Sequence, residues 1–159
     1  MALRICTTDG PSHVEVHANV LYALITLGTR TNYQPCTILD YALKHLNYRI
    51  KLNTGSTQCQ NMLSMAYCAL AHAYMLSGNY TEAINNCHQS RRVATDDIEG
   101  SRWFEWADIY EAWNLIAMAK LEEAETVILQ RFAKQSATQE TGGSSSFMSV
   151  DYALLESLN

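Results

Sequence analysis

The chain has 159 residues, of which 48% are hydrophobic and 17% charged, and its net charge is −5. This length and apolar content suffice for one domain with its own core and exclude a disordered chain. Nucleic acid is not an expected partner, because phosphate binding needs clustered Lys and Arg on a basic surface. No apolar run approaches the ~18 residues of a membrane span, so no membrane partner is expected either.

The five cysteines form no C-x-x-C pair, and their odd number suits no disulfide framework. Free cysteines behave as small buried hydrophobic residues, which indicates a reducing compartment. The first residues contain no apolar stretch of signal-peptide length. We therefore expect a cytoplasmic protein.

Turn residues and helical spacing predict six helices in three antiparallel hairpins. The first helix follows a capping box, Ser12-x-x-Glu15, and stops at Gly28. Pro35 opens the second helix. The residues from Asp96 to Gly100 are predicted to form a polar connection. The expected helices cover residues 13–27, 35–52, 56–76, 80–94, 101–119 and 121–137.

The chain is expected to have three parts. Residues 1–137 form the helical domain, residues 138–146 a Gly/Ser linker, and residues 147–159 a short amphipathic helix. Within the helical domain, similar sequences follow the turns at Gly78 and Ala119. These matching turns indicate an internal repeat with a period of about 41 residues.

One stretch carries a specific pattern. A bulky residue, Leu, a small residue and Tyr precede a Gly turn, and an aromatic residue and Ala follow it. Small residues let two helices approach closely, and Gly adopts the left-handed conformation that ends a helix. The pattern resembles the tetratricopeptide repeat (TPR), with the roles filled by Tyr67, Leu70, Ala71, Tyr74, Gly78, Tyr80 and Ala83.

The resemblance is partial outside this stretch. Cys87 and Ser90 stand where the family prefers an aromatic residue and Ala, and Thr95 where Pro is usual. In the third hairpin, Ala119 replaces Gly and Glu111 replaces Leu. The long period is most similar to that of fungal long-repeat TPR arrays. The resemblance implies an all-α solenoid of about three repeats plus a short C-terminal helix.

In such a solenoid the first helix of each pair lines a concave groove. The first hairpin is expected to contribute Val20, Ala23 and Leu27. The groove is predicted to be apolar and almost uncharged, without the Lys, Arg and Asn that members of the family use to clamp a peptide carboxylate. The candidate binding residues are Met65, Cys68, His72, Met75, Trp106, Ile109, Tyr110 and Trp113.

An apolar groove of this kind requires a covering partner. The candidates are a hydrophobic peptide or protein helix, a small apolar molecule, a second copy of the chain in a homodimer, and the chain's own residues 147–159. The leading hypothesis is a protein-interaction module that binds a protein or peptide. The alternative is a small-molecule binder or a cofactor-free cyclase or isomerase, with His72, Tyr110 or Glu105 as its polar groups.

The sequence contains no motif of a known catalytic or metal site. His13 and His17 are one helical turn apart but lack the H-E-x-x-H pattern. Cys87 and His88 are adjacent, so on a helix their side chains point about 100° apart. Phosphate-binding loops and nucleophile elbows are absent. The sequence therefore identifies no catalytic residue by a motif, and we expect no cofactor and no metal.

Overall fold

A computed structural model describes residues 13–31 and 33–140, which form six α-helices and no strand. The all-helical prediction is therefore confirmed. None of the described helices is long and apolar enough to cross a membrane. The predicted C-terminal helix at 147–159 lies outside the described residues, as do residues 141–146 of the predicted linker. The helices are α1 (His13–Arg30), α2 (Pro35–Leu52), α3 (Thr57–Leu76), α4 (Tyr80–Val93), α5 (Ile98–Ala117) and α6 (Leu121–Glu140).

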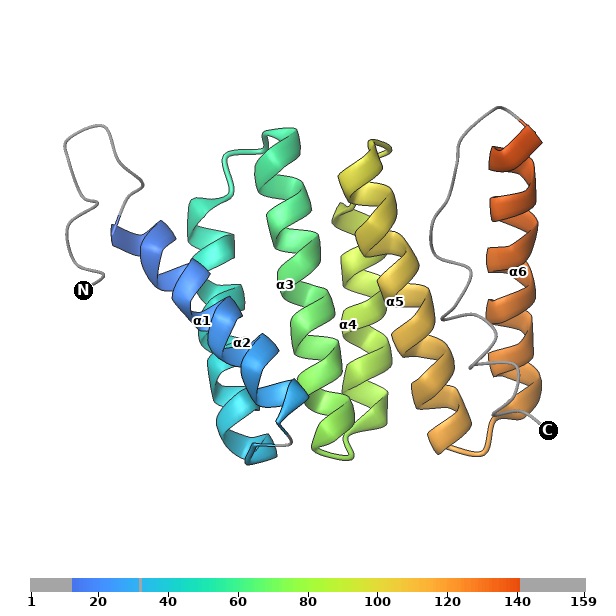
Figure 1. The fold of residues 1–159 in the computed structure, drawn as a ribbon, viewed down its shortest axis with the longest axis horizontal. Coiled ribbons are helices and arrows are strands. Elements are labelled where there is room, and N and C mark those ends of the chain that lie inside the picture. Colours follow the sequence, from blue (N-terminus) through green and yellow to red (C-terminus); the bar gives the residue numbers. More distant parts are fainter. Residues whose placement is uncertain (1–12, 32, 141–159) are drawn as a thin grey trace.

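The helices stand side by side in a row that follows the chain from α1 and α2 at one end to α6 at the other (Figure 1). Each helix packs against the next one, and α3 also packs against α1 and α5. Three apolar clusters fill the contacts, one among α1, α2 and α3, one among α3, α4 and α5, and one between α5 and α6. The central helix α3 buries residues on most of its sides, as its apolar sequence predicts.

Side-chain caps fix the starts of three helices. Ser56, Asn79 and Asp97 accept hydrogen bonds from backbone N–H groups three residues ahead, at 3.3, 3.4 and 2.7 Å. Each cap satisfies a donor that the first turn would otherwise leave without a partner. Because Asp97 is a cap, α5 begins at Ile98. The prediction that residues up to Gly100 belong to a polar connection was therefore wrong.

The predicted stop at Gly28 was also wrong, since α1 continues to Arg30. Gly28 is buried inside the helix, and a Cβ atom there would lie 3.0 Å from Cγ1 of Ile38. The glycine therefore lets α2 approach closely instead of ending α1. The capping box predicted at Ser12 lies outside the described residues. At the other end of the chain, α6 extends beyond its predicted end, to Glu140.

The turns after α3 and α5 share one backbone geometry. Gly78 and Ala119 both have positive φ, +74° and +58°. In each turn this residue donates its N–H to the carbonyl three residues back, at 3.0 and 2.9 Å, and the next residue donates to the carbonyl five residues back, at 2.9 Å in both. This is the Schellman motif, which satisfies the last carbonyls of a helix. The two turns that match in sequence therefore also match in backbone conformation.

The burial of small residues has the same period. The separation from Ala71 to Ala112 and from Ala83 to Ala124 equals that from Gly78 to Ala119. None of these four alanines is more than 1% exposed. They lie in the contacts of α3 with α4 and of α5 with α6. The absence of a larger side chain allows close approach of the helix backbones.

Candidate functional site

A groove with a volume of about 370 Å³ crosses α1, α3 and α5. Helix α3 packs against both other helices and so lies between them as the floor. Helix α5 provides a wall of four aromatic side chains, and α1 provides a wall that is richer in hydroxyl groups. The groove is lined by Tyr22, Ile25, Thr26, Thr29, Arg30, Met65, Cys68, Ala69, His72, Trp103, Trp106, Tyr110 and Trp113.

Tyr110 is the centre of an aromatic cluster in this groove. Its ring stacks on His72 from α3, with centroids 4.9 Å apart, and on Trp106, with centroids 5.6 Å apart. It meets Trp113 edge to face at 5.8 Å. Trp106, Tyr110 and Trp113 share one face of α5 because they follow the i, i+4, i+7 spacing. All four rings are partly exposed, so they form an aromatic surface that reaches solvent.

The groove is electrically neutral except at one edge. Burial raises the pKa of Tyr110 and of Tyr22, and it lowers the pKa of His72. Burial also raises the pKa of Cys68 to about 12, so this thiol is not a thiolate near neutral pH. Arg30 is the single charged side chain of the lining.

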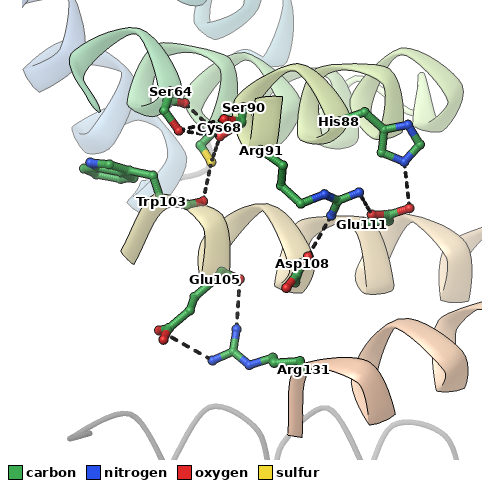
Figure 2. A network of polar contacts seen from close by, with 10 residues as sticks. All are labelled: Ser64, Cys68, His88, Ser90, Arg91, Trp103, Glu105, Asp108, Glu111 and Arg131. Atoms are coloured by element: carbon green, nitrogen blue, oxygen red, sulfur yellow. Dashed lines mark hydrogen bonds and ion pairs between the residues drawn. The ribbon is translucent and has the colours of Figure 1, made fainter. Parts of the chain in front are cut away.

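A buried polar contact holds the floor of the groove to α4 (Figure 2). The hydroxyl oxygens of Ser64 and Ser90 lie 2.8 Å apart, and each hydroxyl is also 3.0 Å from the other residue's carbonyl oxygen. The thiol of Cys68 lies 3.2 Å from the Ser90 hydroxyl and 3.3 Å from the carbonyl oxygen of Trp103. These contacts join α3, α4 and α5, and they fix the position of Cys68 beneath the aromatic wall.

Six of the eight predicted binding residues line the groove: Met65, Cys68, His72, Trp106, Tyr110 and Trp113. Ile109 does not, because it is 2% exposed and packs against α6 together with Ala112 and Ile128. Met75 is partly buried outside the lining. Both residues lie at the edge of the helix face that the groove uses, where a rotation of about 100° per residue turns a side chain toward a neighbouring helix.

The groove wall from α1 differs from the prediction. Val20 and Leu27, 52% and 60% exposed, lie on the opposite side of α1 from the groove, and Ala23 is also exposed and outside the lining. The groove face of α1 instead carries Tyr22 and its neighbours one and two turns later. Their i, i+4, i+7 spacing is present in the sequence, but two of the three are threonines, so apolar periodicity does not mark this face. The groove residues that the prediction missed are Tyr22, Ile25, Thr26, Thr29, Arg30, Ala69 and Trp103.

Glu105, suggested as a polar group of the pocket, is directed to α6 instead (Figure 2). Its carboxylate lies 3.9 Å from the guanidinium of Arg131, which also donates to the Glu105 carbonyl at 2.8 Å. Within residues 13–31 and 33–140, no group of three His, Cys, Asp or Glu side chains could hold a metal ion.

A charged cluster outside the groove joins α4 to α5 (Figure 2). Arg91 donates to Asp108 at 2.8 Å and to Glu111, whose other carboxylate oxygen lies 2.9 Å from His88 Nε2. The Arg91 side chain is 19% exposed and both carboxylates are 11% exposed. The members of this cluster come from two different helices, so no pattern within one helix indicates it.

Comparisons of the chain with protein-family models, with curated proteins and with solved structures give no match. The groove is therefore interpreted from its own chemistry.

Proposed function

We propose that the chain is a TPR-like interaction module that binds a segment of a protein or peptide in the groove. The observation that carries this proposal is the cluster of His72, Trp106, Tyr110 and Trp113, four partly exposed rings on one wall and floor of an open groove. Aromatic side chains dominate the binding energy of many interfaces, and they bind best where a partner removes them from water.

The repeated geometry supports the TPR-like part of the proposal. Two helix pairs share the same turn and the same buried alanines, and both features recur with one period. Helices α1, α3 and α5 are the first helices of the three hairpins, and they are also the three that line the groove. Stacked helix pairs of this kind present extended surfaces for binding.

A second candidate function is the binding of a small apolar molecule, with or without its cofactor-free conversion. The groove volume of about 370 Å³ favours this candidate, because it lies in the range of small-ligand pockets. Native mass spectrometry of the purified chain against apolar aromatic compounds tests it. A bound compound that Trp113→Ala abolishes would favour this candidate over a peptide partner.

The main experiment selects binders from a random dodecapeptide library on the immobilised full chain. We expect peptides with a Trp, Phe or Leu anchor. Trp113→Ala and Trp106→Ala each weaken their binding at least about 30-fold, since loss of a hot-spot tryptophan costs about 2 kcal/mol or more. Leu129→Ala is the matched control, because Leu129 is 57% exposed on α6 outside the groove. Equal binding by Trp113→Ala, with helix content unchanged by circular dichroism, would overturn the groove assignment.

Two competing occupants come from the chain itself. If residues 147–159 fill the groove, the variant Tyr152→Ser/Leu155→Ser binds selected peptides and the wild type does not. If a second copy fills it, sedimentation shows a dimer that Trp113→Ala dissociates. A monomeric wild type that binds peptides as tightly as the double variant supports an external partner.

A further inference from the structure

We infer that the bound segment carries a carboxylate close to its apolar anchor, and that Arg30 binds this carboxylate. This inference rests on the proposed function, since it names the chemistry of the partner at the same groove. Its basis is the distribution of charge and hydrogen-bond donors around the lining.

Arg30 stands at the edge of the groove in the last turn of α1. Its side chain is exposed and makes no ion pair within the part of the chain that the structure describes. The acidic residue of α1, Glu15, lies about four helical turns away. Asp40, the acidic residue of α2, is bound to Lys44 at 2.6 Å. A carboxylate for Arg30 must therefore come from outside these two helices.

The two threonines of the α1 wall do not compete with Arg30 as donors. The hydroxyl of Thr26 donates to the carbonyl of Tyr22 at 2.9 Å, and the hydroxyl of Thr29 donates to the carbonyl of Thr26 at 3.0 Å. Because each hydroxyl has one proton, these side chains present methyl groups and acceptor oxygens to the groove. The guanidinium of Arg30 is the one charged donor of this wall.

The charge of the lining favours an anionic partner over a cationic one. Aromatic rings can bind a cation through their faces. However, no Asp or Glu lines the groove, and on α5 the carboxylates of Asp108 and Glu111 are bound to Arg91. A cation would face the positive charge of Arg30 without a counter-charge. A carboxylate would instead meet a planar guanidinium that can bind both of its oxygens.

The arrangement of the helices fixes where the carboxylate lies relative to the anchor. Arg30 on α1 and the tryptophans on α5 stand on opposite sides of α3. Neighbouring helix axes lie about 8–10 Å apart, and the long Arg and Trp side chains span much of the distance between the walls. An extended peptide rises about 3.3 Å per residue. We therefore place the carboxylate within about three residues of the anchor.

The test compares library selections on the wild type and on Arg30→Glu. We expect wild-type binders with Asp or Glu within about three residues of an aromatic residue or Leu. The Arg30→Glu selection is expected to keep the anchor and replace the acidic residue by Lys or Arg. Arg92→Glu makes the same change of charge at an exposed site on α4 outside the groove, and it is expected to keep the acidic preference.

A titration of one selected peptide gives the size of the effect. Exchange of its Glu for Gln, or its Asp for Asn, weakens binding to the wild type about tenfold and weakens binding to Arg30→Gln less than twofold, as a charge-assisted pair requires. Selected peptides without an acidic residue, an unchanged preference in Arg30→Glu, or no enrichment at all would overturn the inference. Apolar peptides that still depend on Trp113 would leave the proposed function standing, whereas independence from Trp113 would overturn both.

Discussion

The start of α5 depends on the smallest possible side chain. A Cβ atom at Gly100 would lie 2.0 Å from the carbonyl oxygen of Thr95 and 2.7 Å from two further backbone atoms of that residue. The N–H of Gly100 also donates to Asp97 at 2.7 Å. The loop backbone therefore packs directly against the first turn of the helix. A Cβ atom at residue 100 would force one of these two backbone segments to move.

We predict that Gly100→Ala lowers the free energy of unfolding by about 3 kcal/mol, the size expected when a substitution forces apart packed backbone segments. Urea denaturation measures it. Gly55→Ala is the control, because Gly55 has φ +81° with no atom within 4 Å of the added Cβ. Its cost is the local strain alone, about 1 kcal/mol. A cost for Gly100→Ala no larger than for Gly55→Ala would contradict the contact.

His45 makes the stability depend on pH. It is fully buried between α1 and α2, and its Nδ1 lies 2.8 Å from the carbonyl oxygen of Ala18. Burial, with a smaller contribution from the charge of Arg49, lowers its pKa from 6.5 to about 4. Between these values the unfolded chain binds more protons than the folded one, so stability falls as the pH falls from 6.5 toward 4.

We predict that this residue alone lowers the free energy of unfolding by up to about 1.4 kcal/mol per pH unit in that window. The measurement is urea denaturation of the wild type and of His45→Gln between pH 4.5 and 7. The variant is expected to have a shallower slope, whatever its absolute stability. Burial also lowers the pKa of His72, so this residue contributes to the pH dependence of stability in both proteins. Equal slopes would show that His45 is not buried in its neutral form.

The turns that follow α3 and α5 have the same backbone geometry but different residues, so substitutions in them can be compared directly. Both have a residue with positive φ in a Schellman motif, but one turn has glycine and the other alanine. A Cβ at Gly78 would meet no atom within 4 Å, so a substitution there changes only backbone strain. Alanine in the left-handed region costs about 1–2 kcal/mol, a strain that glycine does not have.

We predict opposite effects from exchange of these residues. Gly78→Ala lowers the free energy of unfolding by about 1 kcal/mol, and Ala119→Gly raises it by up to about 1 kcal/mol. The double exchange is expected to leave stability near that of the wild type, since the turns are separate. Thermal or urea denaturation measures all three variants. Destabilisation by Ala119→Gly would show that its side chain, and not its backbone conformation, fixes this turn.

The helices were predictable because their signals are local. Pro35 occupies the first position of α2, and Ser56 and Asn79 cap α3 and α4. Each of these signals lies within one turn of the helix start that it indicates, and the structure has the three helices at the expected places. A glycine such as Gly28 is also a local signal, which usually indicates the end of a helix. Here it instead lies inside α1 and allows close contact with α2. That contact is set by tertiary packing, which a one-dimensional pattern does not contain.

At the scale of the whole molecule, the groove was predictable only in part. The faces of α3 and α5 follow from helical spacing within two hairpins that share one period, so most of their lining was found. The wall from α1 was missed because its threonines do not belong to an apolar pattern. The orientation of this wall depends on how α2 docks against α3, and on polar contacts between α1 and α2 such as the partly buried one from Arg49 to Asn19 at 2.6 Å.

The ion-pair partners of Arg91 were likewise not predictable from the sequence. Arg91 looks like a surface charge at a helix end, but its partners Asp108 and Glu111 become neighbours only when α5 packs on α4. No local pattern connects these residues. The same cluster lies outside the groove lining, which leaves Arg30 as the charge that a groove ligand would meet.

We propose above that the aromatic groove on α1, α3 and α5 binds a partner segment. All three tryptophans of the chain line this groove, so intrinsic tryptophan fluorescence reports on it alone. The decisive experiment is therefore a titration of the full chain with a selected peptide that lacks tryptophan. We predict a saturable emission change whose midpoint equals the Kd from calorimetry. Calorimetric binding without any change in tryptophan emission would contradict the claim.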